Sequence, residues 1–205
     1  RDLAARGVGE LKDRDVKPVS STFKANISVS IDSDTLDGCP IFCGRVIQGV
    51  KNGPSPVWLQ QALRAIGMRP ISFLVDVTNF FTIDRNRPLH VFDVDKIAGN
   101  LRVHRALGGE SISALDDKEY IFQAGQMMIS DDNGAQSIAG IMGGAVTGCT
   151  EETVNVFVES AYWDPIQIAY TGRALQINSD ARYRFERGVD PVSYTHLTLP
   201  TILLV

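Results

Sequence analysis

The spacing of apolar residues in the first third of the chain changes from the strand period to the helical period. Residues 22–34 alternate apolar and polar side chains, which predicts a half-buried strand. Residues 43–50 predict a second strand, and Asn52-Gly53 after it predicts a turn. Residues 55–66 then carry apolar side chains at the i, i+3, i+4, i+7 positions of an amphipathic helix.

Two helices are predicted to follow each other here. For the first, Ser55 is the expected N-cap, Pro56 suits the first helical position, and Gly67 suits a left-handed C-terminal cap. The second helix is predicted to begin at Pro70. The residues expected on its core face are Ile71, Leu74, Val75 and Thr78.

Beyond residue 91 the pattern is that of short strands. Asn133-Gly134 is a strong hairpin signal, and Asp164-Pro165 opens a predicted helix that runs to about residue 175. Helices near the start, many strands and a later helix indicate an α+β fold, in which mixed or antiparallel β-sheets are flanked by helices. The candidate strands are 101–106, 111–115, 119–122, 127–130, 136–139 and 154–160.

The composition is that of an ordinary globular chain. Its 205 residues, 44% hydrophobic and 21% charged, suit one domain, or one domain with flanking pieces. The net charge of −4 gives no broad cationic surface, so nucleic acid is expected to be contacted only locally. No apolar run has the length that crosses a bilayer, so no membrane partner is expected. The start at Arg1-Asp2 leads us to expect a piece of a longer protein.

The cysteines do not indicate a disulfide framework or a metal site. Cys39, Cys43 and Cys149 are odd in number and lack a Cys-x-x-Cys spacing, so free thiols in a reducing compartment are expected. His90 and His104 do not complete a zinc-ligand pattern with them.

The stretch from residue 75 to residue 93 carries the first candidate site. It sets Asp76, Thr78 and Asn79 among apolar residues, and polar groups in such a setting need partners. An Asn-Arg-Pro turn follows, so we expect a helix, a tight reversal and an extended segment that brings His90 back beside Thr78 and Asn79. These groups suit a ligand, but from the local sequence alone a satisfied structural histidine beside a capping aspartate is the favoured interpretation.

Two further features are candidates for a site. In the glycine-rich segment 139–144, Gly140 and Gly143 permit close backbone approach, although a tight strand connection explains them nearly as well. Glu159 ends an apolar strand in which Phe157 shares its face, and there a carboxylate is costly unless it is paired or exposed. No nucleophile motif is present, so any ester hydrolysis is expected to use a positioned water.

Several motifs occur in an order that resembles one family, the β subunit of bacterial phenylalanyl-tRNA synthetase, in its editing domain. The resemblance runs from about residue 1 to residue 191. It implies a tail of the preceding segment at 1–36, the editing domain at 37–191, and a non-family C-terminal tail at 192–205. The motifs are Val-Asp-Val-Thr-Asn at 75–79, Pro88-x-His90-x-Phe-Asp, Ser55-Pro56-x-Trp58-Leu59, Arg69-Pro70-Ile71, Ala-Gly-Ile-Met-Gly-Gly at 139–144 and Arg-Phe-Glu-Arg-Gly-Val-Asp-Pro at 184–191.

The resemblance implies an editing pocket, with no certain catalytic residue and no metal. In this family the Glu159 carboxylate accepts a hydrogen bond from a tyrosyl hydroxyl, so tyrosine wrongly joined to the phenylalanine tRNA is removed by hydrolysis. Gln176 and Arg182 depart from the family pattern, where a glycine and a small hydroxyl residue are usual. The implied pocket residues are Thr78, Asn79, His90, Gly140, Gly143, Glu159, Ser179 and Ala181.

The resemblance also implies a larger enzyme. It is a ligase of protein biosynthesis that binds tRNA(Phe) in the cytoplasm and pairs with an α subunit as an α2β2 heterotetramer. ATP and Mg²⁺ serve that whole enzyme, and no cofactor is expected in these 205 residues. The alternative is a structural module that packs on the α subunit and the tRNA without hydrolytic activity of its own.

Overall fold

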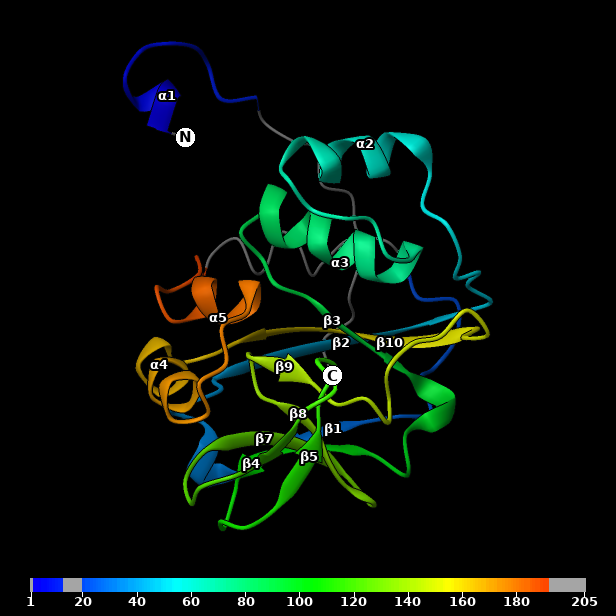
Figure 1. The fold of residues 1–205 in the computed structure, drawn as a ribbon, viewed down its shortest axis with the longest axis vertical. Coiled ribbons are helices and arrows are strands. Elements are labelled where there is room, and N and C mark those ends of the chain that lie inside the picture. The colour runs from blue at the N-terminus through cyan, green and yellow to red at the C-terminus, as the bar shows by residue number, and fades with distance from the viewer. Residues whose placement is uncertain (1, 13–19, 192–205) are drawn as a thin grey trace.

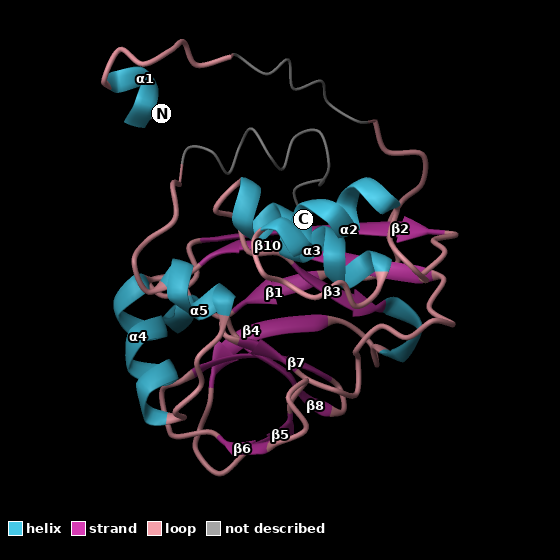
Figure 2. Ribbon diagram, turned by 45° about the horizontal axis from the view of Figure 1, so that its top comes forward, coloured by secondary structure: helices cyan, strands magenta, loops and turns pink. Residues whose placement is uncertain are grey.

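The computed structural model describes residues 2–12 and 20–191. The predicted tail at 192–205 lies outside this part of the chain, as do residues 1 and 13–19. Figure 1 shows two helices, α2 and α3, above a small sheet, with a larger sheet beneath it and α4 and α5 at one end. Figure 2 shows the same stacking with helices and strands distinguished by colour.

The element order confirms the expected α+β fold. Three antiparallel strands form one sheet in the order β2-β10-β3, and five form the other in the order β1-β4-β7-β8-β9, where only β1 and β4 are parallel. Strands β5 and β6 form a separate pair. The elements are α1 Asp2–Ala5, β1 Val29–Ile31, β2 Ile41–Gln48, α2 Val57–Ala65, α3 Phe73–Asp84, β3 His90–Asp93, β4 Leu101–Arg105, β5 Ser111–Ser113, β6 Glu119–Ile121, β7 Met127–Asp131, β8 Gly134–Ile138, β9 Met142–Gly143, β10 Asn155–Tyr162, α4 Pro165–Ala174 and α5 Asp180–Phe185, with 3-10 turns at Ser33–Thr35 and Val94–Lys96.

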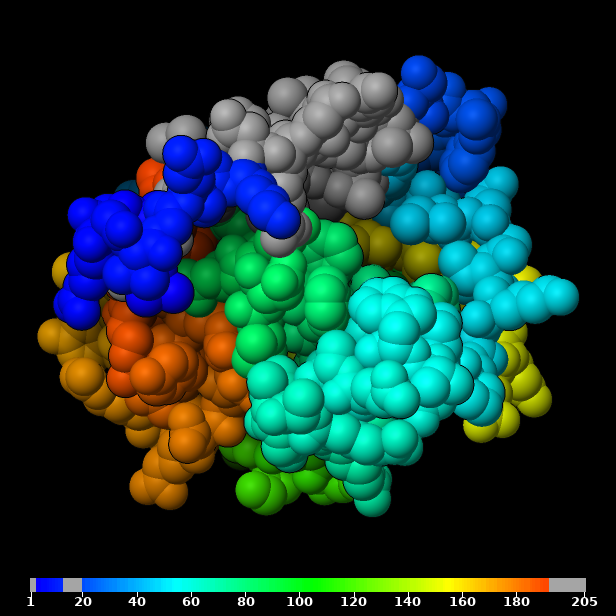
Figure 3. Space-filling model, turned by 90° about the horizontal axis from the view of Figure 1, so that it is seen from above, coloured from blue at the N-terminus to red at the C-terminus, as the bar shows by residue number. Residues whose placement is uncertain are grey.

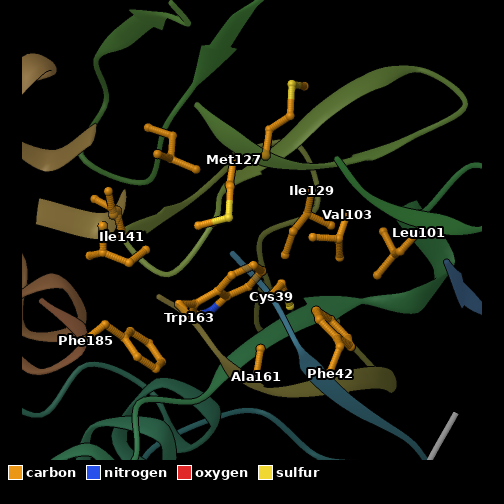
Figure 4. Packing of buried hydrophobic residues seen from close by; sticks show 14 of the residues in the cluster. Cys39, Phe42, Leu101, Val103, Met127, Ile129, Ile141, Ala161, Trp163 and Phe185 are labelled. Atoms are coloured by element: carbon orange, nitrogen blue, oxygen red, sulfur yellow. The ribbon is translucent and has the colours of Figure 1, made fainter. Parts of the chain in front are cut away.

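The main hydrophobic core lies between the two larger sheets. Figure 4 shows Trp163 at its centre, with Met127 and Ile141 on the side of the five-stranded sheet and Phe42 and Ala161 on the side of the three-stranded sheet. The rings of Trp163 and Phe42 meet edge to face at 6.3 Å between centroids. Each such buried apolar side chain contributes about 1.5–3 kcal/mol, so this layer fixes the distance between the sheets.

Strand β10 alternates as its sequence predicts. Val156 belongs to a second cluster with Leu74 of α3 and Val91 of β3, whereas Phe157 belongs to the main core. Successive side chains of a strand point to opposite faces, so Glu159 shares the core-facing side with Phe157. The helix layer therefore covers one face of β10 and the five-stranded sheet covers the other.

The helix N-termini are where local signals were wrong. Ser55 is not an N-cap: its buried hydroxyl donates to Oδ2 of Asp76 at 2.5 Å, and α2 begins at Val57. The second helix begins at Phe73 rather than Pro70, because Asp76 also accepts the N–H of Ile71 at 2.8 Å and holds that residue outside the helix. Ile71 is consequently exposed rather than part of the core face.

The ends of other strands and helices depend on which residues pair with a neighbouring strand or cap a helix. Of the predicted strand 22–34 only Val29–Ile31 pairs, in parallel with β4. Strand β1 comes from the segment before residue 37 but pairs with β4 in the five-stranded sheet. The sheet therefore includes residues on both sides of the expected domain boundary. The boundary itself stays a prediction. Gly67 does take the left-handed conformation after α2 at φ 81°, and Asp164 caps α4 by accepting from the N–H of Gln167.

Candidate functional site

The chain reverses between α3 and β3 as predicted. Asn86 adopts φ 52° in the left-handed region, where asparagine is tolerated, and β3 begins four residues later at His90. Leu74 of α3 packs on Val91 and Val156. The reversal thus lays α3 on one face of the β3–β10 pair and presents His90 at the start of β3.

His90 and Glu159 occupy directly opposite positions in the antiparallel β3–β10 ladder. Side chains that face each other in this way have Cβ atoms roughly 4.5–5.5 Å apart. The Nε2 atom of His90 and the Oε2 atom of Glu159 are both buried, and neither has a hydrogen-bond partner among the described residues. Buried polar atoms normally have partners, so two orphans on facing residues indicate a place prepared for a ligand.

Burial keeps both side chains neutral near pH 7. It raises the pKa of Glu159 to about 8 and lowers the pKa of His90 to about 4, because the charged forms lose hydration. The protonated carboxyl of Glu159 can donate as well as accept a hydrogen bond, and the neutral imidazole of His90 keeps one nitrogen as an acceptor. The pair therefore suits hydroxyl groups or water rather than a charged ligand.

Gly143 brings a third element to this pair. A Cβ atom built on Gly143 in β9 would come within 2.7 Å of Nε2 of His90, and closer still to Cε1. The ring of His90 also stands edge-on to Phe92, at 4.4 Å between centroids. The glycine leaves the space that the imidazole occupies, so β3, β9 and β10 meet at one place.

Two residues that the sequence did not single out adjoin Glu159. Gly44 lies opposite it on β2, and a Cβ there would collide with the Phe157 ring. Cys39 is fully buried, and both its burial and the proximity of the Glu159 charge raise the pKa of its thiol. A glycine inside the predicted strand 43–50 was the available signal, because such glycines often mark a close approach.

The other predicted site residues support the surrounding structure. Gly140 adopts φ 68°, and a Cβ there would lie 2.7 Å from Trp163, so it faces the core. Ser179 donates to the carbonyl of Ile141 at 2.7 Å and caps α5 by accepting from the N–H of Arg182. This bond ties α5 to the glycine-rich segment. Ala181 of α5 packs against the main core.

Thr78 and Asn79 lie on α3. Val91 and His90 point to opposite faces of the strand, and α3 packs on the face of Val91. The hydroxyl of Thr78 donates to the carbonyl of Val75 at 2.8 Å, within its own helix. Among the described residues no hydrogen bond or ring contact joins either residue to His90, so their place in the site stays a prediction. The carboxylate of Asp76, in contrast, already accepts hydrogen bonds from the hydroxyl of Ser55 and the N–H of Ile71.

Within residues 2–12 and 20–191, no three histidine, cysteine or acidic side chains gather where they could hold a metal ion. None of the helices in this part of the chain combines the length and the apolar character that crossing a membrane requires.

Comparison with known proteins assigns this chain to a family. Residues 38–198 match the model of the B3/4 domain. The chain belongs to the B3/4 domain family. Two curated relatives are named phenylalanine--tRNA ligase beta subunit: that of Ruegeria pomeroyi is 71% identical over 95% of this chain, and that of Cereibacter sphaeroides is 63% identical over 100% of it. These matches confirm the resemblance seen in the sequence.

The chain matches about a quarter of the length of each of those relatives. The chain spans 24% of the Ruegeria protein and 25% of the Cereibacter protein. A solved N-terminal fragment of the phenylalanyl-tRNA synthetase beta subunit from Pyrococcus horikoshii superposes with a TM-score of 0.52, covering 79% of this chain and 52% of that chain. Its identity to the B3/4 domain is 15%, so this likeness concerns the fold alone.

The two departures from the family pattern lie at the junction of α4 and α5. Gln176 follows α4 in the left-handed region at φ 56°, a conformation in which glycine is favoured. Arg182 packs over Gly172, donates to the carbonyls of Gly172 and Ile177, and pairs with Glu186 at 3.0 Å. The charged run 182–187 forms ion pairs within and next to α5, between Arg184 and Asp180 and between Glu186 and both Arg182 and Arg187.

Proposed function

We propose that this B3/4 domain hydrolyses the ester of an aminoacyl-tRNA, removing tyrosine wrongly joined to tRNA(Phe). The observation that carries the proposal is the facing pair of His90 and Glu159, each with a buried polar atom that lacks a partner, beside the glycine at position 143. A bound side chain with a hydroxyl group supplies the hydrogen bond that Glu159 lacks, so it stabilises the complex more than a side chain without a hydroxyl.

Glu159 provides the selectivity in this proposal. Tyrosine and phenylalanine differ by one phenolic hydroxyl, and an apolar pocket rejects such an addition by only about a hundredfold. A second site that prefers the hydroxyl removes the remaining error. Because burial raises the pKa of Glu159 to about 8, its carboxyl exchanges hydrogen bonds with a neutral phenol without a charge being buried.

His90 and the backbone near Gly143 position the reacting water. The water oxygen attacks the ester carbonyl, the bond to the ribose oxygen breaks, and the ribose oxygen receives a proton as the amino acid leaves. Neutral His90 accepts a hydrogen bond from water or from a ribose hydroxyl, while positioning and fixed dipoles lower the barrier. Thr78, Asn79, Gly140, Ser179 and Ala181 are proposed to complete the pocket through support and shape.

The wider context belongs to the same proposal. The chain acts as part of a phenylalanine--tRNA ligase β subunit, which pairs with an α subunit as an α2β2 heterotetramer, binds tRNA(Phe) and works in the cytoplasm. ATP and Mg²⁺ serve aminoacylation in that whole enzyme. Since no three histidine, cysteine or acidic side chains gather in the described part of the chain, no step here is routed through the metal.

The test is a deacylation assay in which Tyr-tRNA(Phe) and Phe-tRNA(Phe) are incubated with and without the 205-residue chain. We expect the tyrosyl ester to be lost faster with the protein, and faster than the phenylalanyl ester. Loss at the spontaneous rate for both would refute the proposal. It would instead favour the structural module, in which the domain packs on the α subunit and the tRNA without hydrolysis.

A further inference from the structure

The core-facing side of the three-stranded sheet carries two adjacent rows of residues that run across its strands. In one row Gly44 of β2 and His90 of β3 lie on either side of Glu159 of β10. In the next row Phe157 is the central residue, and Phe92 lies beside it on β3. Alternate residues of a strand share a face, so both rows point toward the main core. Two buried aromatic rings therefore adjoin the two residues of the candidate site.

Each of these rings reaches into the row that holds the candidate site. The Phe92 ring stands perpendicular to the imidazole of His90, at 4.4 Å between centroids. The Phe157 ring lies over Gly44, because a Cβ atom built on that glycine would overlap the Cζ and Cε2 atoms of the ring. The ring thus fills the space that a side chain of residue 44 would occupy opposite Glu159. The two phenyl rings meet at 6.2 Å between centroids. We call Phe157, Phe92 and the imidazole of His90 the ring series.

The ring series has little room to move. Phe92 is 0% exposed and Phe157 is 1% exposed. On its other side Phe157 stacks on Phe42, which Figure 4 shows among the buried residues between the two larger sheets. The opposite face of the sheet is covered by α3, which Figure 3 shows in green with α2 in cyan on that side of the molecule. Because protein interiors are close-packed, a displaced Phe157 ring must push on a neighbouring ring.

We propose that Gly44 and Phe157 are positioning residues, which hold His90 and Glu159 in place for a bound aminoacyl ester. Gly44 leaves room for a ring, Phe157 fills that room, and the contact of Phe157 with Phe92 supports the imidazole from behind. This inference rests on the proposed function, because the reaction that these residues serve is the hydrolysis proposed above. It adds β2 to the site through a residue that has no side chain.

A purely structural role in the core is the alternative for Phe157. Two observations favour positioning. The ring series ends at the imidazole of His90, and the glycine that admits Phe157 lies opposite Glu159 in the β2–β10 ladder. At both ends of this arrangement a buried polar atom has no partner within the described residues. The rings also keep water from these atoms, and hydrogen bonds to a ligand are stronger in such an environment.

Substitution on both sides of the contact between Gly44 and Phe157 tests the inference. Gly44→Ala is expected to displace the ring and to lower kcat/KM for the tyrosyl ester roughly tenfold, since misplacing a reacting group by about 1 Å can cost about a hundredfold. The three atoms nearest to the added methyl group are Cζ, Cε2 and Cε1 of Phe157, which leucine lacks. The double variant Gly44→Ala/Phe157→Leu is therefore expected to recover most of the lost rate.

NMR spectroscopy follows the position of His90 without any reaction. The ring current of Phe92 shifts the resonances of the His90 ring protons, and the spectrum of His90→Gln identifies them among the three histidines of the chain. We expect these resonances to move in Gly44→Ala and to return toward the wild-type values in Gly44→Ala/Phe157→Leu. Phe122→Leu truncates another buried ring of the main core and, as the matched control, should leave them in place.

Two results would overturn the inference: His90 resonances that stay in place in Gly44→Ala, or an equal movement in Phe122→Leu. Circular dichroism checks that each variant is folded. If Gly44→Ala does not fold, Phe157→Leu alone serves the test, because it removes the contact with Phe92 and should also move the resonances.

The positioning role and the proposed function can fail separately. If the wild-type chain leaves both esters intact but the His90 resonances respond as expected, the proposed function is refuted and the positioning of His90 is supported. If the wild-type chain releases tyrosine and the resonances do not respond to Gly44→Ala, the proposed function is supported and the positioning role is refuted.

Discussion

Glu159 lies directly opposite His90 in the pairing of β10 with β3, and each presents a buried polar atom that has no partner within residues 2–12 and 20–191. Leaving such atoms unsatisfied costs about 1–3 kcal/mol each. A fold that was selected for stability alone would replace them with apolar residues. We interpret this cost as the energetic signature of a binding site, and it has consequences for stability as well as for activity.

The first consequence is a decrease in stability above neutral pH. Glu159 binds its proton more tightly in the folded state, with a pKa raised to about 8, so unfolding releases a proton between about pH 4.5 and pH 8. His90, with a pKa lowered to about 4, opposes this until the pH is well above its unfolded pKa of roughly 6.5. The free energy of unfolding is therefore expected to fall by roughly 1 kcal/mol from pH 6.5 to pH 8.

Urea denaturation at a series of pH values measures this slope. Glu159→Gln keeps the shape and stays neutral, so its free energy of unfolding is not expected to fall from pH 6.5 to pH 8. Glu119→Gln, an exposed residue on β6, is the control and should keep the wild-type slope. An equal slope in wild type and Glu159→Gln would show that the Glu159 carboxyl is not buried and neutral.

Replacement of Gly143 is expected to disturb the site through His90. The methyl group of Gly143→Ala would overlap the imidazole, so the ring must move and tyrosyl-ester hydrolysis should fall at least tenfold. Gly53→Ala is the matched control, because a Cβ there meets nothing within 4 Å. Deacylation rates compare the two variants, and equal activity would mean that the position of His90 is unimportant for the reaction.

Ser55 is expected to matter for stability despite not capping a helix. Ser55→Ala removes a 2.5 Å hydrogen bond to the buried carboxylate of Asp76, which should cost about 1–3 kcal/mol of unfolding free energy. Ser21→Ala removes only a surface bond to the carbonyl of Phe23 and should change stability by less than about 0.5 kcal/mol. Chemical denaturation would contradict this account if both variants matched wild type.

Replacement of Gln176 by glycine is expected to increase the stability of the folded protein. Gln176 holds φ 56° after α4, where a residue with a Cβ is strained and glycine is not. Gln176→Gly should therefore raise the free energy of unfolding by about 0.5–1 kcal/mol, after the entropy cost of glycine is deducted. Gln176→Ala keeps the strain and should stay near wild type. A thermal-unfolding midpoint that is lower for the glycine variant would contradict this assignment.

Elements with local signals could be predicted from the sequence. The hairpin signalled by Asn133-Gly134 forms between β7 and β8, with Asp132 and Asn133 in its turn, and Asp164 caps α4, because turn and cap chemistry depends on near neighbours. Ser55 misled because its hydroxyl is taken by Asp76, 21 residues further along the chain. The extent of β1 depended on pairing with β4, about 70 residues away, which no local pattern records.

Individual residues of the candidate site could be predicted from the sequence, but their arrangement in the fold could not. His90 and Glu159 stand out in the sequence because polar groups in apolar segments need partners. The strand register that sets them opposite each other is a property of the folded sheet. Gly44 adjoins Glu159 through the separate pairing of β2 with β10. Conversely, Thr78 and Asn79 are near His90 in the sequence, yet strand alternation separates their helix from the face that His90 presents.

The most direct test measures the ratio of deacylation rates for Tyr-tRNA(Phe) and Phe-tRNA(Phe) in the wild-type chain and in Glu159→Ala, with Glu119→Ala as the exposed control. We predict a ratio well above one for the wild type and the control, and a ratio close to one for Glu159→Ala. A Glu159→Ala variant that still prefers the tyrosyl ester to the wild-type degree would contradict the account.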